Sequence, residues 1–194
     1  MTRLFIIIAT ALLLSSCNAE LTAHPWELLD FSSEEEFISH VRDFQSVFSE
    51  DESHDDSHKV ANVTHYYKFK NPPTGANLNR ISLGTTGVNI AVEYRNSQHL
   101  NDLGEPEGVM IQYAPHYLFD AEKRDAWTPQ TFHEAREIDG TTYFIRKGDG
   151  IAGLLWAVEW INAEGYRMYS AFPYRFTADE VLAYVSDLER VEIG

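Results

Sequence analysis

The chain is poor in cysteine and in basic residues, and its first hydrophobic run is short. One cysteine excludes a disulfide within the chain, so packing alone must hold the fold. Lys and Arg number 15 against 30 Asp and Glu, and this acidic balance disfavours nucleic-acid partners because it repels phosphate. The apolar run from Leu4 to Leu14 is shorter than the about 20 residues that a transmembrane helix needs.

The N-terminus has the layout of a secretory signal, with Arg3 before the apolar run and small residues after it. The run ends in the tetrad Leu14-Ser15-Ser16-Cys17. This tetrad resembles the lipobox of bacterial prolipoproteins, although Ser16 is less common there than Gly or Ala. The resemblance implies cleavage before Cys17 and diacylglycerol on its thiol. An ordinary cleaved signal peptide followed by a chance cysteine is the alternative.

A lipid on Cys17 would hold the protein at the extracytoplasmic face of a bacterial membrane, since stable anchoring takes more than one acyl chain. Whether that membrane is the inner or the outer one stays open. Three parts are then expected, namely a signal peptide at 1–16, a tether at 17–30 and one domain at 31–194. With 44% hydrophobic and 13% aromatic residues, a domain of this length can bury a core.

Two helices are predicted near the ends of the domain. The first spans about 33–48, where Ser32 or Ser33 caps it, and Phe37, Val41, Phe44 and Phe48 form one apolar stripe. The second follows Thr177, which forms a capping box with Glu180. Its expected buried positions are Val181, Tyr184, Val185 and Leu188.

Period-two patterns predict strands between these helices. The clearest has Val88, Ile90, Val92 and Tyr94 on one face. Others are expected at 60–69, 78–84, 109–113, 142–147, 154–160 and 166–172, with hairpin turns at 84–87 and 162–165. Thr128-Pro129 favours a short helix at 129–136. The predicted class is α+β, a mainly antiparallel sheet with an N-terminal and a C-terminal helix packed on one face.

An acidic loop at 49–59 contains candidate metal ligands. His54 and His58 are four residues apart, with Asp55 between them, and a helix would place both imidazoles on one face. His24 and His40 could complete such a site. The segment is poor in helix formers, however, so a solvated acidic loop is the simpler interpretation. His133-Glu134 lacks the second histidine that a zincin motif requires.

No motif indicates catalysis or a cofactor. There is no Gly-x-Ser-x-Gly elbow, no glycine-rich phosphate loop, and no carboxylate pair that stands out for glycoside hydrolysis. The sequence therefore predicts a protein that is not an enzyme. A group of C-terminal aromatic residues either binds a sugar or peptide or stabilises the sheet, the more common use. Its members are Tyr143, Trp156, Trp160, Tyr166 and Tyr169.

The C-terminal third also resembles a domain of unknown function found in secreted and lipid-anchored bacterial proteins. The shared features are the strand ending in Trp160, the turn to Gly165-Tyr166 and the helix opened by Thr177. Tyr66-Tyr67, Ile81 and Tyr94 also resemble such chains. This resemblance implies an extracytoplasmic α+β domain and transfers no catalytic residue.

The expected function is a membrane-anchored lipoprotein that binds a protein or an envelope component. Two alternatives remain, a metal-binding lipoprotein that uses the arm at 49–59 and a hydrolase of envelope polymers.

Overall fold

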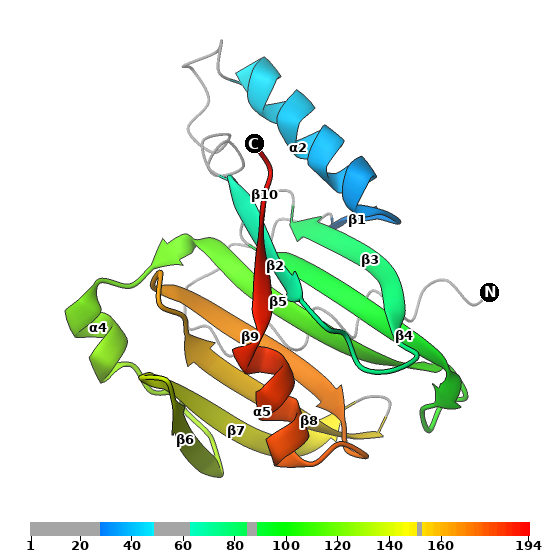
Figure 1. Cartoon of the computed structure of the whole chain (residues 1–194), viewed down its shortest axis with the longest axis vertical. Helices are drawn as coiled ribbons and strands as arrows, with labels where there is room; N and C mark the ends of the chain where they lie inside the picture. The colour runs from blue at the N-terminus through cyan, green and yellow to red at the C-terminus, as the bar shows by residue number, and fades with distance from the viewer. Residues whose placement is uncertain (1–27, 49–62, 85–88, 151–152) are drawn as a thin grey trace, which may run out of the picture.

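The computed structural model describes residues 28–48, 63–84, 89–150 and 153–194. Most of these residues form antiparallel strands, and eight strands make one large sheet of order β1-β3-β4-β5-β9-β8-β7-β6 (Figure 1). Its strands in chain order are β1 (Leu28–Phe31), β3 (Asn77–Gly84), β4 (Ile90–Leu100), β5 (Pro106–Leu118), β6 (Glu134–Ile138), β7 (Thr141–Gly150), β8 (Gly153–Ile161) and β9 (Tyr166–Pro173).

A second sheet of two strands crosses one face of the large sheet (Figure 1). It pairs β2 (His65–Phe69) with β10 (Leu188–Glu192), the second and the last strand of the described chain. Four of the five residues of β2 are buried, because the strand lies between the large sheet and its other covering elements. β2 thus supplies side chains to the core, whereas the residues of β10 are half-buried or exposed.

Three helices are described. They are α2 (Glu34–Phe48), α4 (Ala121–Ala126) and α5 (Ala178–Ser186). The capping box predicted at Thr177 and Glu180 is present in α5, and Val181, Leu182 and Val185 are its buried residues. None of the described helices has the length and apolar character needed to cross a membrane.

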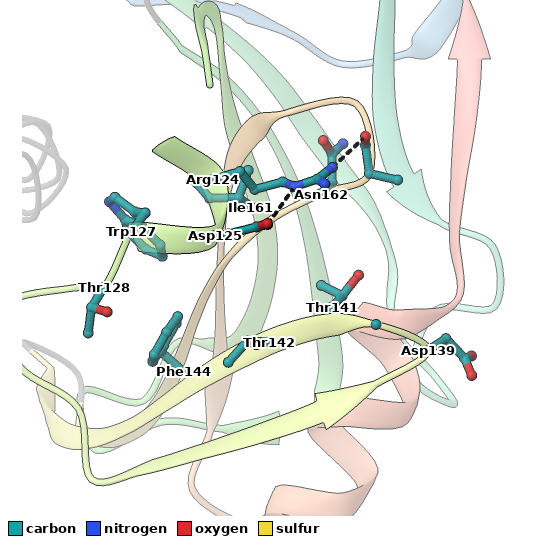
Figure 2. A pocket seen from close by; sticks show the side chains of 12 residues that line it. Arg124, Asp125, Trp127, Thr128, Asp139, Thr141, Thr142, Phe144, Ile161 and Asn162 are labelled. Carbon is teal, nitrogen blue, oxygen red and sulfur yellow. Dashed lines mark hydrogen bonds and ion pairs between the residues drawn. The ribbon is translucent and has the colours of Figure 1, made fainter. Parts of the chain in front are cut away.

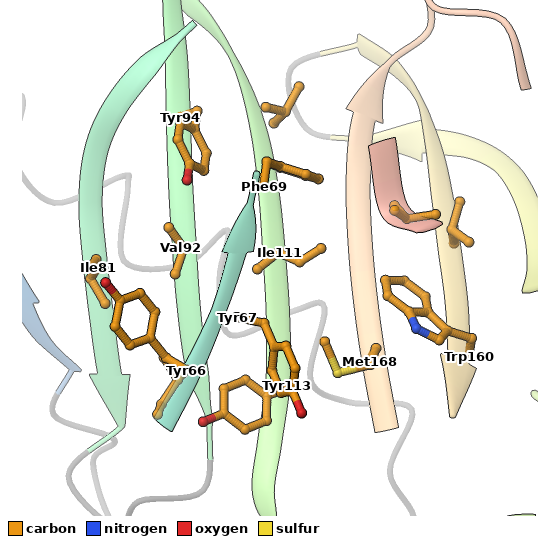
Figure 3. Packing of buried hydrophobic residues seen from close by; sticks show 14 of the residues in the cluster. Tyr66, Tyr67, Phe69, Ile81, Val92, Tyr94, Ile111, Tyr113, Trp160 and Met168 are labelled. Carbon is orange, nitrogen blue, oxygen red and sulfur yellow. The ribbon is translucent and has the colours of Figure 1, made fainter. Parts of the chain in front are cut away.

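The core lies between the large sheet on one side and β2, α2 and α5 on the other (Figure 3). Val92 in β4 and Ile111 in β5 are directly opposite each other, and the ring of Phe69 in β2 contacts the ring of Phe172 in β9 at 5.6 Å between centroids. The largest fully buried side chains are Trp160, Tyr66, Tyr113, Phe37, Phe69, Phe172, Ile81, Leu83, Ile90, Ile111, Ile145 and Met168.

The predicted class, α+β with an N-terminal and a C-terminal helix packed on one face, is wrong. The described chain is mostly antiparallel β, and its last element is the strand β10 rather than a helix. The physical reason is that β2 and β10 pair with each other and occupy much of the face that the helices were expected to cover.

Several element predictions are confirmed. Helix α2 begins one residue after the predicted start, where Ser33 accepts a hydrogen bond from the backbone N–H of Glu36 at 3.2 Å. Ile90, Val92 and Tyr94 of β4 are buried as predicted, and Asn162 and Gly165 close the hairpin between β8 and β9. The predicted tether reached residue 30, but Leu28–Phe31 instead forms the edge strand β1 against β3. The predicted turn at 84–87 lies mostly outside the described residues.

Candidate functional site

The lipidation candidate Cys17 and the metal-ligand candidates His54, Asp55 and His58 fall outside the part of the chain that the structure describes. His40, which could complete the metal site, is described and lies in α2, with its ring 5.0 Å from the ring of Phe31. Within the described ranges, no three or more His, Cys, Asp and Glu side chains are grouped as a metal ion would require. Both hypotheses therefore remain predictions.

The C-terminal aromatic residues are largely structural. Trp160 is 2% exposed, and Tyr143 is buried against it with 5.4 Å between ring centroids. The indole N–H of Trp156 donates to the carbonyl of Phe176 at 2.8 Å, so this half-buried side chain is also held in place. Trp160 and Tyr143 therefore pack the sheet, while Trp156 also borders a second hollow with His133, Glu134, Ile145 and Lys147.

A different aromatic pair lines a cleft between α4, the β6–β7 hairpin and the β8–β9 turn (Figure 2). We call it the Trp127 cleft, and its volume is about 240 Å³. Its lining residues are Arg124, Asp125, Trp127, Thr128, Asp139, Gly140, Thr141, Thr142, Phe144, Ile161, Asn162 and Ala163.

The α4 wall of the cleft is held against the β8–β9 turn by two contacts. The backbone N–H of Phe119 donates to the carbonyl of Gly165 at 2.9 Å, and the Arg124 guanidinium donates to the carbonyl of Ala163 at 3.2 Å. Gly165 has a φ of +93°, and a Cβ atom there would collide with the carbonyl oxygen of Phe119. Glycine is therefore required at the point where the chain before α4 touches the turn.

The opposite wall comes from a hairpin that the sequence reading missed. The predicted helix at 129–136 is wrong, since Glu134–Ile138 is the strand β6 and pairs with β7. Asp139 and Gly140 both have positive φ, 49° and 76°, which is the backbone of a type I′ turn. His133 belongs to this pairing, because its Nδ1 accepts the backbone N–H of Lys147 at 3.1 Å.

Aromatic rings form one side of the Trp127 cleft. Trp127 and Phe144 meet edge to face with 5.6 Å between centroids, and Phe132 packs on Phe144 at 5.0 Å. The guanidinium of Arg167 lies 5.4 Å from the Trp127 ring centre and pairs with Glu159 at 2.7 Å. Trp127 and Phe144 are both half-buried, so the cleft offers fixed apolar surface that solvent still reaches.

Polar groups form the rest of the lining. The hydroxyls of Thr128, Thr141 and Thr142 make no hydrogen bond to another described residue. The guanidinium of Arg124 faces the Asp125 carboxylate at 3.4 Å, so this positive charge is balanced locally. Figure 2 shows Asp139 at the rim, with its carboxylate directed away from Asp125.

A second polar cluster lies where the β8–β9 turn meets the small sheet. His65 of β2 is 3% exposed and contacts the rings of Tyr67, Tyr113 and Tyr166. Its Nδ1 lies 3.2 Å from the Arg190 guanidinium, which can only donate, so Nδ1 is an acceptor and the proton sits on Nε2. That buried Nε2 has no hydrogen-bond partner among the described residues.

Glu164 connects this cluster to both strands of the small sheet. It accepts the Tyr67 hydroxyl at 2.8 Å and the Arg190 guanidinium at 3.1 Å, and its second oxygen lies 3.8 Å from His65 Nε2. Burial lowers the pKa of His65, the Arg190 charge lowers it further, and Glu164 partly opposes the shift. The cluster therefore connects the β8–β9 turn of the large sheet to both strands of the small sheet, and the lowered pKa favours neutral His65.

Comparison of the chain with protein-family models, with curated proteins and with solved structures finds no match in any of the three. The two sequence resemblances thus remain expectations, and the functional argument depends on the geometry of the Trp127 cleft.

Sequence reasoning missed this cleft because its residues come from three separate segments. A signal is present in Asp139-Gly140, a dipeptide typical of a two-residue hairpin turn. Extending strands to both sides of that turn would have placed Thr142 and Phe144 on one face of a strand, since residues two apart share a face. Nothing in the sequence shows that Trp127 lies beside them.

Proposed function

We propose that this chain is a lipid-anchored extracytoplasmic binding protein, with Cys17 as the anchor and the Trp127 cleft as the place where a partner or envelope component binds. The tetrad ending in Cys17 supports the anchor. The acidic chain, of formal charge −15, would be repelled by anionic lipid head groups, so a covalent tether is the means that keeps it near a membrane.

The observation that carries the binding proposal is the composition of the cleft. A concave site with apolar walls and a few polar groups free to bond is the usual form of a ligand site. The Trp127 cleft is concave and mostly polar in its lining, and it combines two half-buried rings with threonine hydroxyls that bond to no other described residue.

Hydrolysis of envelope polymers is less well supported by the same cleft. A glycosidase needs two carboxylates that face one substrate bond, one of them usually a general acid shielded from water. Asp125 and Asp139 are both exposed, and Asp139 points away from Asp125 (Figure 2). This arrangement favours binding over hydrolysis.

The anchor is tested by mass spectrometry of the mature protein isolated from bacterial membranes. We expect an N-terminal peptide that begins at Cys17 and carries diacylglycerol. A Cys17→Ala variant should leave the membrane fraction, and substitution of the neighbouring Asn18 by Ser serves as the control. An unmodified Cys17 thiol in the native protein would contradict the proposal.

The binding site is tested by hydroxyl-radical footprinting of the full chain, with and without solubilised envelope fractions. We expect protection of Trp127 and Phe144, while Tyr174 serves as a control because it is exposed outside the cleft. Equal labelling of Trp127 and Phe144 with every fraction would count against the cleft as a binding site.

A further inference from the structure

We infer that the ligand of the Trp127 cleft is a neutral saccharide, with one sugar ring placed against Trp127 and Phe144. This inference rests on the proposed binding function and adds the chemical class of the ligand. It follows from the charge, the hydrogen-bonding groups and the size of the cleft.

The charge of the cleft disfavours ionic ligands. Arg124 is the one Lys, Arg or His among the described lining residues, and it already binds the Asp125 carboxylate and the Ala163 carbonyl. An anionic ligand would therefore meet no free positive charge in a chain of net charge −15. A cationic ligand would need a carboxylate directed inward, but Asp125 is engaged and Asp139 points away.

The hydrogen-bonding groups suit a ligand rich in hydroxyls. Each threonine hydroxyl can donate one hydrogen bond and accept others, as a sugar hydroxyl can. Thr128 lies beside Trp127, while Thr142 precedes Phe144 by two residues and shares its face of β7. A sugar ring placed between Thr128 and Thr142 would have hydroxyl groups of the protein at its edge.

The aromatic side of the cleft suits the apolar faces of a sugar ring. A pyranose ring has apolar C–H groups on its faces and hydroxyls around its rim, so it can contact an aromatic ring while its rim bonds to polar side chains. Tryptophan likewise combines a large apolar surface with a polar edge. Trp127 is fixed by Phe144 and by Arg167, which reduces the entropy lost on binding.

The size of the cleft limits how much of the ligand it holds. Its volume of about 240 Å³ is below the range from about 300 Å³ that encloses drug-sized ligands. One sugar ring, rather than a long segment of polymer, is therefore the unit that the cleft accepts. The remainder of a longer glycan would extend into solvent.

The test is calorimetric titration of the full chain, solubilised in a detergent without a sugar head group. The probes are a neutral hexose disaccharide, an N-acetylhexosamine disaccharide, a uronic-acid disaccharide and a lysine-rich peptide. We expect at least one neutral disaccharide to bind with a dissociation constant below about 1 mM. The charged probes should bind at least about tenfold more weakly.

Matched variants connect that binding to the cleft. Trp127→Ala should weaken it at least about tenfold, whereas Tyr174→Ala, an exposed aromatic elsewhere, should not change it. If Trp127→Ala fails to fold, Thr142→Val gives the same information, because it removes the hydroxyl at nearly constant shape. Thr142→Ser keeps the hydroxyl and should retain most of the affinity.

The outcomes separate this inference from the proposed function. Trp127-dependent binding of the peptide or the uronic acid alone would overturn the saccharide inference and leave the binding function standing. No Trp127-dependent binding of any probe would also overturn the inference. If footprinting with envelope fractions shows no protection either, the proposed binding function falls with it.

Discussion

Val92 gives the sharpest test of which face of the large sheet is buried. It is 1% exposed in β4, directly opposite Ile81 of β3 and Ile111 of β5. Val92→Asp loses the burial of the valine side chain, about 1.5–3 kcal/mol. It also places a carboxyl group without a partner in the core, which adds several kcal/mol. The sum is comparable with the whole stability of a small domain, about 5–15 kcal/mol, so this variant should be largely unfolded.

The assay is urea unfolding followed by circular dichroism at neutral pH. Ala91→Asp is the matched control, because Ala91 is the neighbouring residue, half-buried on the opposite face of the same strand. It should cost no more than about 1 kcal/mol, the span of strand propensities. A wild-type unfolding midpoint for Val92→Asp, or equal damage from both variants, would refute the assigned faces.

Three further predictions concern the cap, the buried histidine and the turn. Thr177→Ala should lose about 1 kcal/mol of stability by thermal denaturation, and Thr177→Ser should not; an unchanged melting temperature in the alanine variant would contradict the cap. Because its pKa is lowered in the fold, His65 binds its proton more readily in the unfolded chain, so stability should fall as pH drops below about 6.5. His65→Phe should remove that part of the pH dependence, and a wild-type slope would disprove it. Gly165→Ala should cost more than about 1 kcal/mol and shift Trp127 fluorescence, since its Cβ would meet the Phe119 carbonyl; native values of both would refute the close contact.

Local patterns predicted the strands well and their arrangement poorly. Alternation identified the buried face of β4, and the capping box identified the start of α5, because both signals lie within a few consecutive residues. The pairing of β2 with β10 joins the second strand of the described chain to its last one. No local pattern carries that information, and it decides which elements cover the sheet.

The candidate site shows the same limit at smaller scale. Thr128-Pro129 favoured a helix, but the Asp139-Gly140 turn and the pairing of β6 with β7 prevailed. Trp127 reaches the cleft because of the contact between Phe119 and Gly165, which depends on the folded backbone. A sequence alone could indicate the turn but not the cleft that it helps to build.

The most direct measurement on the binding site is a nuclear magnetic resonance titration that follows the tryptophan indole N–H signals as neutral disaccharide is added. Trp160 is buried, and the Trp156 indole N–H already donates to Phe176, so neither signal should move. We expect the Trp127 signal to shift and saturate. A titration in which the Trp127 signal stays fixed while the disaccharide demonstrably binds would contradict the site.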